Sequence, residues 1–163
     1  MSDKPPSLII TAIDPGLSGA VARLEEGKLT ILRDFKALPD IARAVCLLGT
    51  GADLIAIEQV HAMPGEGVVS CFSFGKSTGV ALGAAYLHPG ISVVEVAPQR
   101  WPNYYRKRFN IPKGKPFKEV TREIACQMFP AQADLFRRKK DHNSADAALL
   151  GFYAAKNWEE LGS

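Results

Sequence analysis

The chain has 163 residues, of which 47% are hydrophobic, and a formal net charge of +3. That length fits one domain with a substantial core, and the composition excludes a disordered body. The three cysteines lack the spacing of a zinc site, which predicts reduced thiols in a cytosol-type compartment. Neither a signal peptide nor an apolar run of about 18 residues is evident, so we expect no secretion and no membrane partner.

The first half of the chain predicts four strands and one helix, after a disordered tail over residues 1–7. Three apolar runs separated by short turns predict an antiparallel meander. These runs are residues 8–13, 19–24 and 29–35. A helix over 39–48 and an apolar strand over 52–58 follow. A strand reached through such a crossover is expected to lie parallel in the sheet.

A loop, a helix rich in small residues, a fifth strand, an irregular basic and aromatic segment and two more helices complete the chain. In that order they are 61–69, 70–87, 92–96, 97–117, 118–129 and a last helix that ends at 157. Asp141 or Asn143 is expected to cap this last helix. The predicted architecture is one α/β domain over residues 8–160. Its five-stranded mixed sheet has three antiparallel strands, then parallel ones, and is flanked by helices.

Three carboxylates are candidates for chemistry. Asp14 ends the first strand, Glu58 ends the strand expected beside it, and Asp146 lies in the first turns of the last helix. Singly, each has a structural explanation: a turn hydrogen bond, an ion pair, or a favourable helix dipole. Together they repel one another unless a cation is present. Hard oxygen ligands suit Mg²⁺ or Mn²⁺, and two such ions about 4 Å apart can hydrolyse a phosphodiester.

His142 stands four residues before Asp146 and therefore shares its helix face, whereas Asn143 stands three residues before it. Basic residues gather between Arg100 and Arg122 and again over 137–140. Such clustering is the footprint of a polyanion-binding face, and a solvated surface is the alternative interpretation.

Four segments carry a family resemblance: AIDPGLSGA (12–20), IEQVHAMPG (57–65), SFGKSTGVALGAA (73–85) and KKDHNSADAALLGFYA (139–154). They resemble the RuvC-type Holliday junction resolvases of the RNase H-like superfamily, and the second and fourth look closer to phage-type and organellar relatives. The resemblance implies an RNase H-like fold and a homodimer that binds four-way junction DNA. It also implies symmetric nicks made with two Mg²⁺ or Mn²⁺ ions, which leave 5′-phosphates.

By the same resemblance, Asp14, Glu58 and Asp146 are metal ligands and catalytic residues. The fourth role is assigned to His142, because Asn143 stands where many relatives have a carboxylate, and Asp141 is the other alternative. His61 stands where some relatives place an aromatic wedge, a role that Met63, Phe72 or Phe74 could take over. The implied DNA contacts are His61, Met63, Phe72, Phe74, Lys76, Arg100, Lys113, Lys115, Lys139 and Lys140.

The helix over 70–87 resembles the family's dimer helix, although its small residues also suit packing on the sheet. The expected compartment is the cytoplasm or nucleoid of a phage- or bacterium-like source, or an organelle matrix. Two other functions stay open. The chain could bind branched DNA without cutting it, or it could be an RNase H-like nuclease for other branched or hybrid substrates. A nucleotide-handling, actin-like protein needs a duplicated domain, for which the chain is too short.

Overall fold

The computed structural model describes residues 7–61 and 65–162 and contains one five-stranded sheet in the order β3-β2-β1-β4-β5. The strands are β1 (Ile9–Asp14), β2 (Ala20–Glu25), β3 (Lys28–Asp34), β4 (Leu54–Glu58) and β5 (Ser92–Val96). β1 pairs antiparallel with β2, and β2 with β3, whereas β4 lies parallel to both β1 and β5. The predicted mixed sheet is therefore confirmed, and β1 is its central strand.

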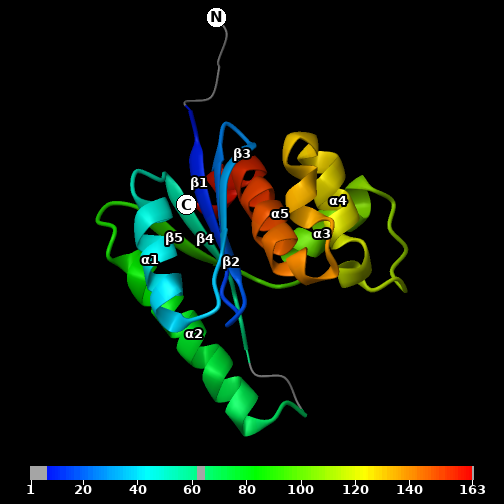
Figure 1. Cartoon of the computed structure of the whole chain (residues 1–163). Coiled ribbons are helices and arrows are strands. Elements are labelled where there is room, and N and C mark those ends of the chain that lie inside the picture. The colour runs from blue at the N-terminus through cyan, green and yellow to red at the C-terminus, as the bar shows by residue number, and fades with distance from the viewer. Residues whose placement is uncertain (1–6, 62–64, 163) are drawn as a thin grey trace, which may run out of the picture.

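Helices cover both faces of this sheet (Figure 1). α1 (Leu38–Gly49) and α2 (Val68–Tyr86) pack on one face, and α3 (Arg100–Arg108), α4 (Thr121–Met128) and α5 (His142–Lys156) on the other. Four short elements complete the chain: η1 (Phe117–Glu119), η2 (Pro130–Phe136), η3 (Lys139–Asp141) and α6 (Trp158–Leu161). Because the central strands are buried from both sides, they appear in the sequence as continuous apolar runs.

α5 lies very close to the centre of the sheet. A Cβ at Gly151 would collide with the end of the Leu24 side chain, so glycine lets this helix cross β2 without displacing that side chain. Ala147, Ala148 and Leu150 of the same helix are buried with Ile10 in the same core cluster. This close packing fixes the N-terminal turns of α5, which carry Asp146, against the ends of the central strands.

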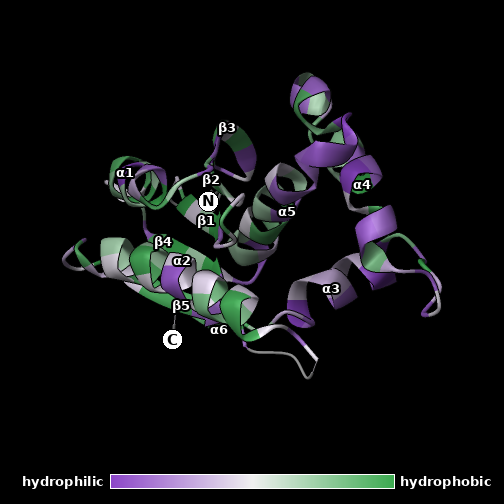
Figure 2. Cartoon of the chain, turned by 60° about the horizontal axis from the view of Figure 1, so that its bottom comes forward, coloured by the Kyte–Doolittle hydropathy of each residue, from purple (hydrophilic) through white to green (hydrophobic). Residues whose placement is uncertain are grey.

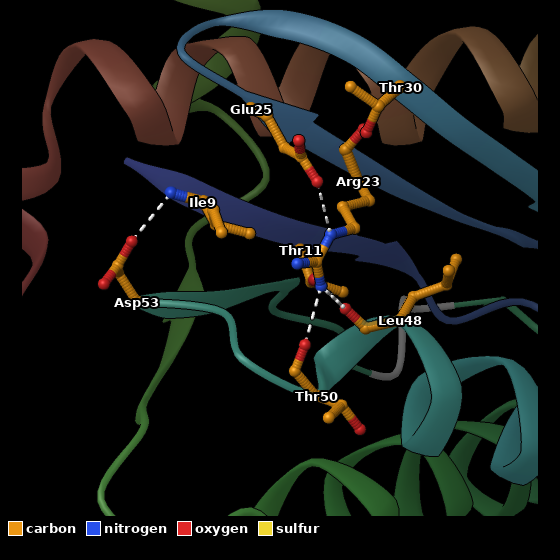
Figure 3. Close-up of polar contacts among 8 residues, drawn as sticks. All are labelled: Ile9, Thr11, Arg23, Glu25, Thr30, Leu48, Thr50 and Asp53. Atoms are coloured by element: carbon orange, nitrogen blue, oxygen red, sulfur yellow. Dashed lines mark hydrogen bonds and ion pairs between the residues drawn. The ribbon is translucent and has the colours of Figure 1, made fainter. Parts of the chain in front are cut away.

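The C-terminal end of α1 is tied to β1 and β2 by side-chain donors (Figure 3). The Arg23 guanidinium donates to the carbonyl oxygens of Leu48 and Thr50, both at 2.8 Å, and the Thr11 hydroxyl donates to Leu48 at 2.6 Å. α1 has no basic residue in its own last turn, so these donors satisfy carbonyls that a helix end leaves free. These hydrogen bonds attach the end of α1 to the two central strands β1 and β2, a few residues before β4 begins.

One expectation about the second half was wrong: the segment 97–117 is not irregular throughout, because Arg100–Arg108 forms α3. Asp141 does stand at the N-cap position of α5, as one of the two predicted caps, but its carboxylate accepts from the backbone N–H of Arg138 and not from the first turn of α5. The expected tail falls almost wholly on residues 1–6, which lie outside the described residues, as does Met63.

α2 projects beyond the sheet and is the most exposed apolar element. Val68, Val69 and Phe72 in its first turns are 85%, 80% and 73% exposed. Among the described residues, α2 is the one helix whose length and composition would allow it to cross a membrane, which the sequence interpretation did not expect. Packed helices of globular proteins meet the same criterion, and α2 packs on α1, so the absence of a membrane partner stays a prediction.

Candidate active site

The three candidate carboxylates line one cleft of about 630 Å³. Asp14 ends β1, Glu58 ends β4 and Asp146 lies on α5. Parallel pairing matches Ile13 with Ile57, so the next residues, Asp14 and Glu58, lie side by side as the last residues of their strands. The sheet and the helix packed on it thus bring together acids that lie up to 132 positions apart in the sequence, from Asp14 to Asp146.

Asp14 serves its turn and faces the cleft at the same time. The backbone N–H of Gly16 hydrogen-bonds its carboxylate, and this contact lowers the pKa of Asp14. The chain then returns so tightly that a Cβ at Gly19 would collide with the Asp14 carbonyl oxygen. The turn interpretation of Asp14 is therefore confirmed, and only part of its hydrogen-bonding capacity is used in the turn. Its role as a metal ligand stays a prediction.

The cleft penalises negative charge. Burial and then the charge of Glu58 raise the pKa of Asp14 to about 7. Burial, followed by the charges of Asp14 and Glu58, raises the pKa of Asp146 well above its ordinary range. Burial also raises the pKa of Glu58, against a hydrogen bond from Trp101 that lowers it. Such mutual repulsion is what a bound cation would relieve.

Lys118 is the counter-charge that the sequence interpretation did not assign to the site. Its ammonium group lowers the pKa of Asp14, Glu58 and Asp146, and its side chain lines the cleft. Trp101 and Thr121 were also missed, and they hydrogen-bond Glu58 and Asp146 respectively. Nothing in the sequence indicated that a tryptophan and a threonine would contact these acids, because the contacts form only when α3 and α4 pack on the sheet.

The three candidates for the fourth position have different surroundings. His142 and Asn143 line the cleft, and the Asn143 amide donates to the backbone oxygen of Ser18. Asp141 is 7% exposed and its carboxylate accepts hydrogen bonds from Arg138. Burial raises the pKa of Asp141, but these hydrogen bonds together with the charges of Arg138 and Lys140 outweigh it and leave the pKa below its ordinary value.

His142 is oriented by its own backbone neighbourhood. Its Nδ1 lies 3.3 Å from the carbonyl oxygen of Lys139. In the tautomer that donates Nδ1–H to this oxygen, Nε2 is left to bind a cation or accept a proton.

Of the predicted DNA contacts, His61 and Phe74 line the cleft. Phe72 is exposed on α2, and Arg100 lies in a separate hollow on α3 and pairs with Glu160. The predicted lysines are all exposed and lie on α2, on the loop after α3 and on η3: Lys76, Lys113, Lys115, Lys139 and Lys140.

The donor set suits a hard divalent cation. Within residues 7–61 and 65–162, no three His, Cys, Asp or Glu side chains are gathered closely enough to hold a metal ion by themselves. Mg²⁺ does not need such a cage, because it keeps several waters and uses one or two carboxylates plus substrate phosphates. Three mutually repelling carboxylates around an open cleft fit that mode of binding.

A five-stranded mixed sheet in the order β3-β2-β1-β4-β5, with helices on both faces, is the RNase H-like fold. No family model matches the chain. The chloroplastic Holliday junction resolvase MOC1 of Chlamydomonas reinhardtii is 29% identical over 116 residues, which are 71% of this chain and 12% of that protein. The match therefore takes up only about an eighth of that relative's length.

Solved structures identify the fold more closely. Thermus thermophilus RuvC superposes with a TM-score of 0.65 at 16% identity, over 94% of this chain and 96% of that chain. The same protein in complex with a Holliday junction substrate gives 0.64 at 15% identity, with the same coverage. The fowlpox virus Holliday junction resolvase gives 0.54 at 18% identity, over 92% and 99%. The chain has the fold of the RuvC-type Holliday junction resolvases, which confirms the resemblance in its sequence.

Proposed function

We propose that this chain is a structure-specific endonuclease that binds four-way junction DNA as a homodimer and resolves it by symmetric, Mg²⁺-dependent nicks. The observation that carries the proposal is the meeting of Asp14, Glu58 and Asp146 in one cleft of a RuvC-type fold. The relatives are described as Holliday junction resolvases, one of them as chloroplastic. That description supports the organelle-matrix alternative for the compartment.

In this proposal Asp14, Glu58, Asp146 and His142 would hold two Mg²⁺ or Mn²⁺ ions, with Asp14 contributed by the central strand β1. When bound, the ions supply an activated water and stabilise the leaving 3′ oxygen, so that the nick carries a 5′-phosphate. His142 positions the water or accepts its proton through Nε2. Lys118 adds fixed positive charge at the cleft, where the scissile phosphate must enter.

The proposed DNA path lies between two projecting regions on either side of the cleft. Figure 2 shows α3 and α4 as largely hydrophilic and α2 as largely hydrophobic. Exposed lysines such as Lys113 and Lys115 suit phosphate contacts. Phe72 is our choice for the junction wedge, because it is 73% exposed whereas Phe74 is half-buried.

The homodimer is proposed to form through α2. Gly75, Gly79 and Gly83 recur every fourth residue and therefore share one helix face. All three are exposed, and a Cβ at any of them would meet nothing within 4 Å. A face without side chains lets a second helix approach closely, and a symmetric pair of α2 helices gives a self-complementary interface.

The proposal is tested with a synthetic four-way junction and the variants Asp14→Asn and Asp146→Asn. Each variant keeps the size of the side chain and removes a charged ligand. We expect both to bind the junction and to lose nicking by a factor of at least about 10³, as losses of central catalytic groups do. Nicking by either variant at the wild-type rate would remove that residue from the mechanism. Binding without nicking by the wild-type protein would favour a non-cleaving branched-DNA binder.

A further inference from the structure

Trp101 of α3 directs its indole N–H at one oxygen of Glu58. Nε1 donates to Oε1 at 3.0 Å, and the Trp101 side chain is 4% exposed. An indole has one N–H and no acceptor, so this hydrogen bond is the only strong polar contact the side chain can make. The acceptor, Glu58, is the last residue of β4 and lines the cleft.

Aromatic packing holds the indole in this orientation. The Phe117 ring meets it edge-on, with centroids 5.3 Å apart, and the Tyr105 ring does so at 6.4 Å. Tyr105 is fully buried and donates its hydroxyl to the Leu149 carbonyl oxygen at 2.8 Å. Since Leu149 belongs to α5, α3 is attached to the helix that also carries Asp146.

We propose that Trp101 is a positioning residue that sets the orientation in which Glu58 meets a divalent cation. The inference rests on the proposed function, because it concerns the same cleft. A carboxylate at a strand end can rotate about its side-chain bonds, and the indole bond to Oε1 selects one rotation. Oε2 and the remaining lone pairs of Oε1 are then left for the cation and its waters. Hydrogen-bond partners of metal ligands typically contribute 10-fold to 100-fold to metal affinity or activity.

A purely structural Trp101 would be equally buried and would also donate its N–H, because buried indoles usually find an acceptor. Two matched variants separate the possibilities. Trp101→Phe removes the N–H and keeps an aromatic ring. Tyr105→Phe removes another buried hydrogen bond of the same aromatic cluster, one that ends on a backbone carbonyl and not on an acid.

The first measurement is the rise in Tm as Mn²⁺ is added to metal-free protein, which reports binding without catalysis. For Trp101→Phe we expect the Mn²⁺ concentration that gives a half-maximal rise to increase about tenfold. For Tyr105→Phe we expect a lower starting Tm and an unchanged Mn²⁺ dependence. The second measurement is junction nicking, in which Trp101→Phe should need about tenfold more Mg²⁺ and keep the wild-type KM for the junction.

Equal Mn²⁺ responses of the wild-type, Trp101→Phe and Tyr105→Phe proteins would overturn the inference. In the Glu58→Gln background, Trp101→Phe should add no further effect on the Mn²⁺ response, because the two residues act as a unit. A wild-type protein that binds Mn²⁺ but does not nick junctions would refute the proposed function and leave the role of Trp101 standing.

If Trp101→Phe does not fold, the fluorescence emission of Trp101 in the otherwise intact protein tests whether the indole contacts the metal-occupied site. Trp101 and Trp158 are the two tryptophans of the chain, and Trp158 lies on α6, away from the cleft lining. In Trp158→Phe protein, Ca²⁺ should change the remaining emission, and the change should be absent when Glu58→Gln is added. Unchanged emission with Ca²⁺ at saturating concentrations contradicts contact between Trp101 and the occupied site.

Discussion

Three half-buried carboxylates, Asp14, Glu58 and Asp146, line the cleft, and the pKa of each is raised. Burial is the main cause for all three, and neighbouring carboxylate charges add to it for Asp14 and Asp146. The backbone holds them there because two lie at strand ends and the third on a helix packed tightly on the same sheet. The metal-free protein therefore carries an electrostatic strain that a cation, a proton or an amide substitution would each relieve.

Asp14→Asn is expected to stabilise the metal-free protein at pH 8. The folded-state pKa of Asp14 is about 7, above its ordinary value of 3.8, so the ionised group destabilises the fold. This penalty is absent below the ordinary value, grows as the pH rises towards 7, and is complete above it. By linkage the full shift would correspond to about 4 kcal/mol, but the buried amide of the variant keeps much of the desolvation cost, so we expect about 1 kcal/mol. In EDTA, thermal unfolding should show a Tm gain of about 2–4 °C at pH 8, which fades by pH 4.

The same experiment with saturating Mg²⁺ is the control for that prediction. The cation should raise the Tm of the wild-type protein more than that of Asp14→Asn, because the variant lacks one ligand. A variant that is less stable than wild type in EDTA at pH 8 would show that Asp14 acts mainly through its turn hydrogen bond with Gly16.

At the scale of elements, the segment from α3 to η1 combines support for the cleft with exposed positive charge. The Arg106 guanidinium donates to the carbonyl oxygens of Pro112 and Lys115, at 2.9 and 2.8 Å, and so shapes the loop that presents Lys113 and Lys115. Phe117 and Lys118 follow directly and line the cleft. Binding of phosphates by this loop would place DNA next to the carboxylates.

Lys115→Ala is expected to weaken junction binding about equally for all sequences and to leave the positions of the nicks unchanged. Loss of one phosphate contact should reduce the slope of log affinity against log salt concentration by about one. Lys36→Ala is the matched control, because Lys36 is also exposed but lies between β3 and α1. An unchanged slope for Lys115→Ala would show that this lysine is merely solvated.

Gly79→Leu on α2 is expected to separate the proposed dimer into folded monomers. A Cβ at Gly79 meets nothing within 4 Å in the single chain, and replacing a mid-helix glycine favours the helix by roughly 0.5–1 kcal/mol. Sedimentation should therefore show halved mass with a Tm no lower than that of Gly114→Leu, a matched change in a loop. A Gly79→Leu protein that stays dimeric would place the interface elsewhere.

The sheet could be predicted from the sequence because each strand is an apolar run bounded by turn residues. Ile9–Asp14 and Leu54–Glu58 lie within about two residues of their predicted bounds. α3 was missed because the segment 97–117 was interpreted as an irregular basic and aromatic stretch. Pro102 stands in the first helical turn, where the absent N–H has no intrahelical partner in any case.

The candidate site was predictable to the extent that it lies on those strands. Asp14, Glu58 and Asp146 were chosen from the sequence and lie in one cleft. Trp101, Thr121 and Lys118 could not be chosen, because their side chains reach the acids only through the tertiary packing of α3, η1 and α4. No periodicity in the sequence encodes that contact.

At the scale of the whole molecule, the proposal assigns dimerisation to one face of the sheet, whose helix α2 also carries the wedge Phe72, and the phosphate contacts and the third acid to the other face. α1 and α2 on one face offer the uncovered helix for a second copy, and α3, α4 and α5 on the other bring charge and the third acid to the cleft (Figure 1). Two such chains related by a two-fold axis would present two equivalent clefts, which suits symmetric nicking of a four-way junction.

The most direct test of this account compares nicking of a four-way junction with nicking of a linear duplex of the same sequence, with Mg²⁺ and with EDTA. The account predicts paired, symmetric nicks with 5′-phosphates on the junction in Mg²⁺, none in EDTA, and little or no cutting of the duplex. Equal cutting of both substrates, or junction cutting that persists in EDTA, would contradict it.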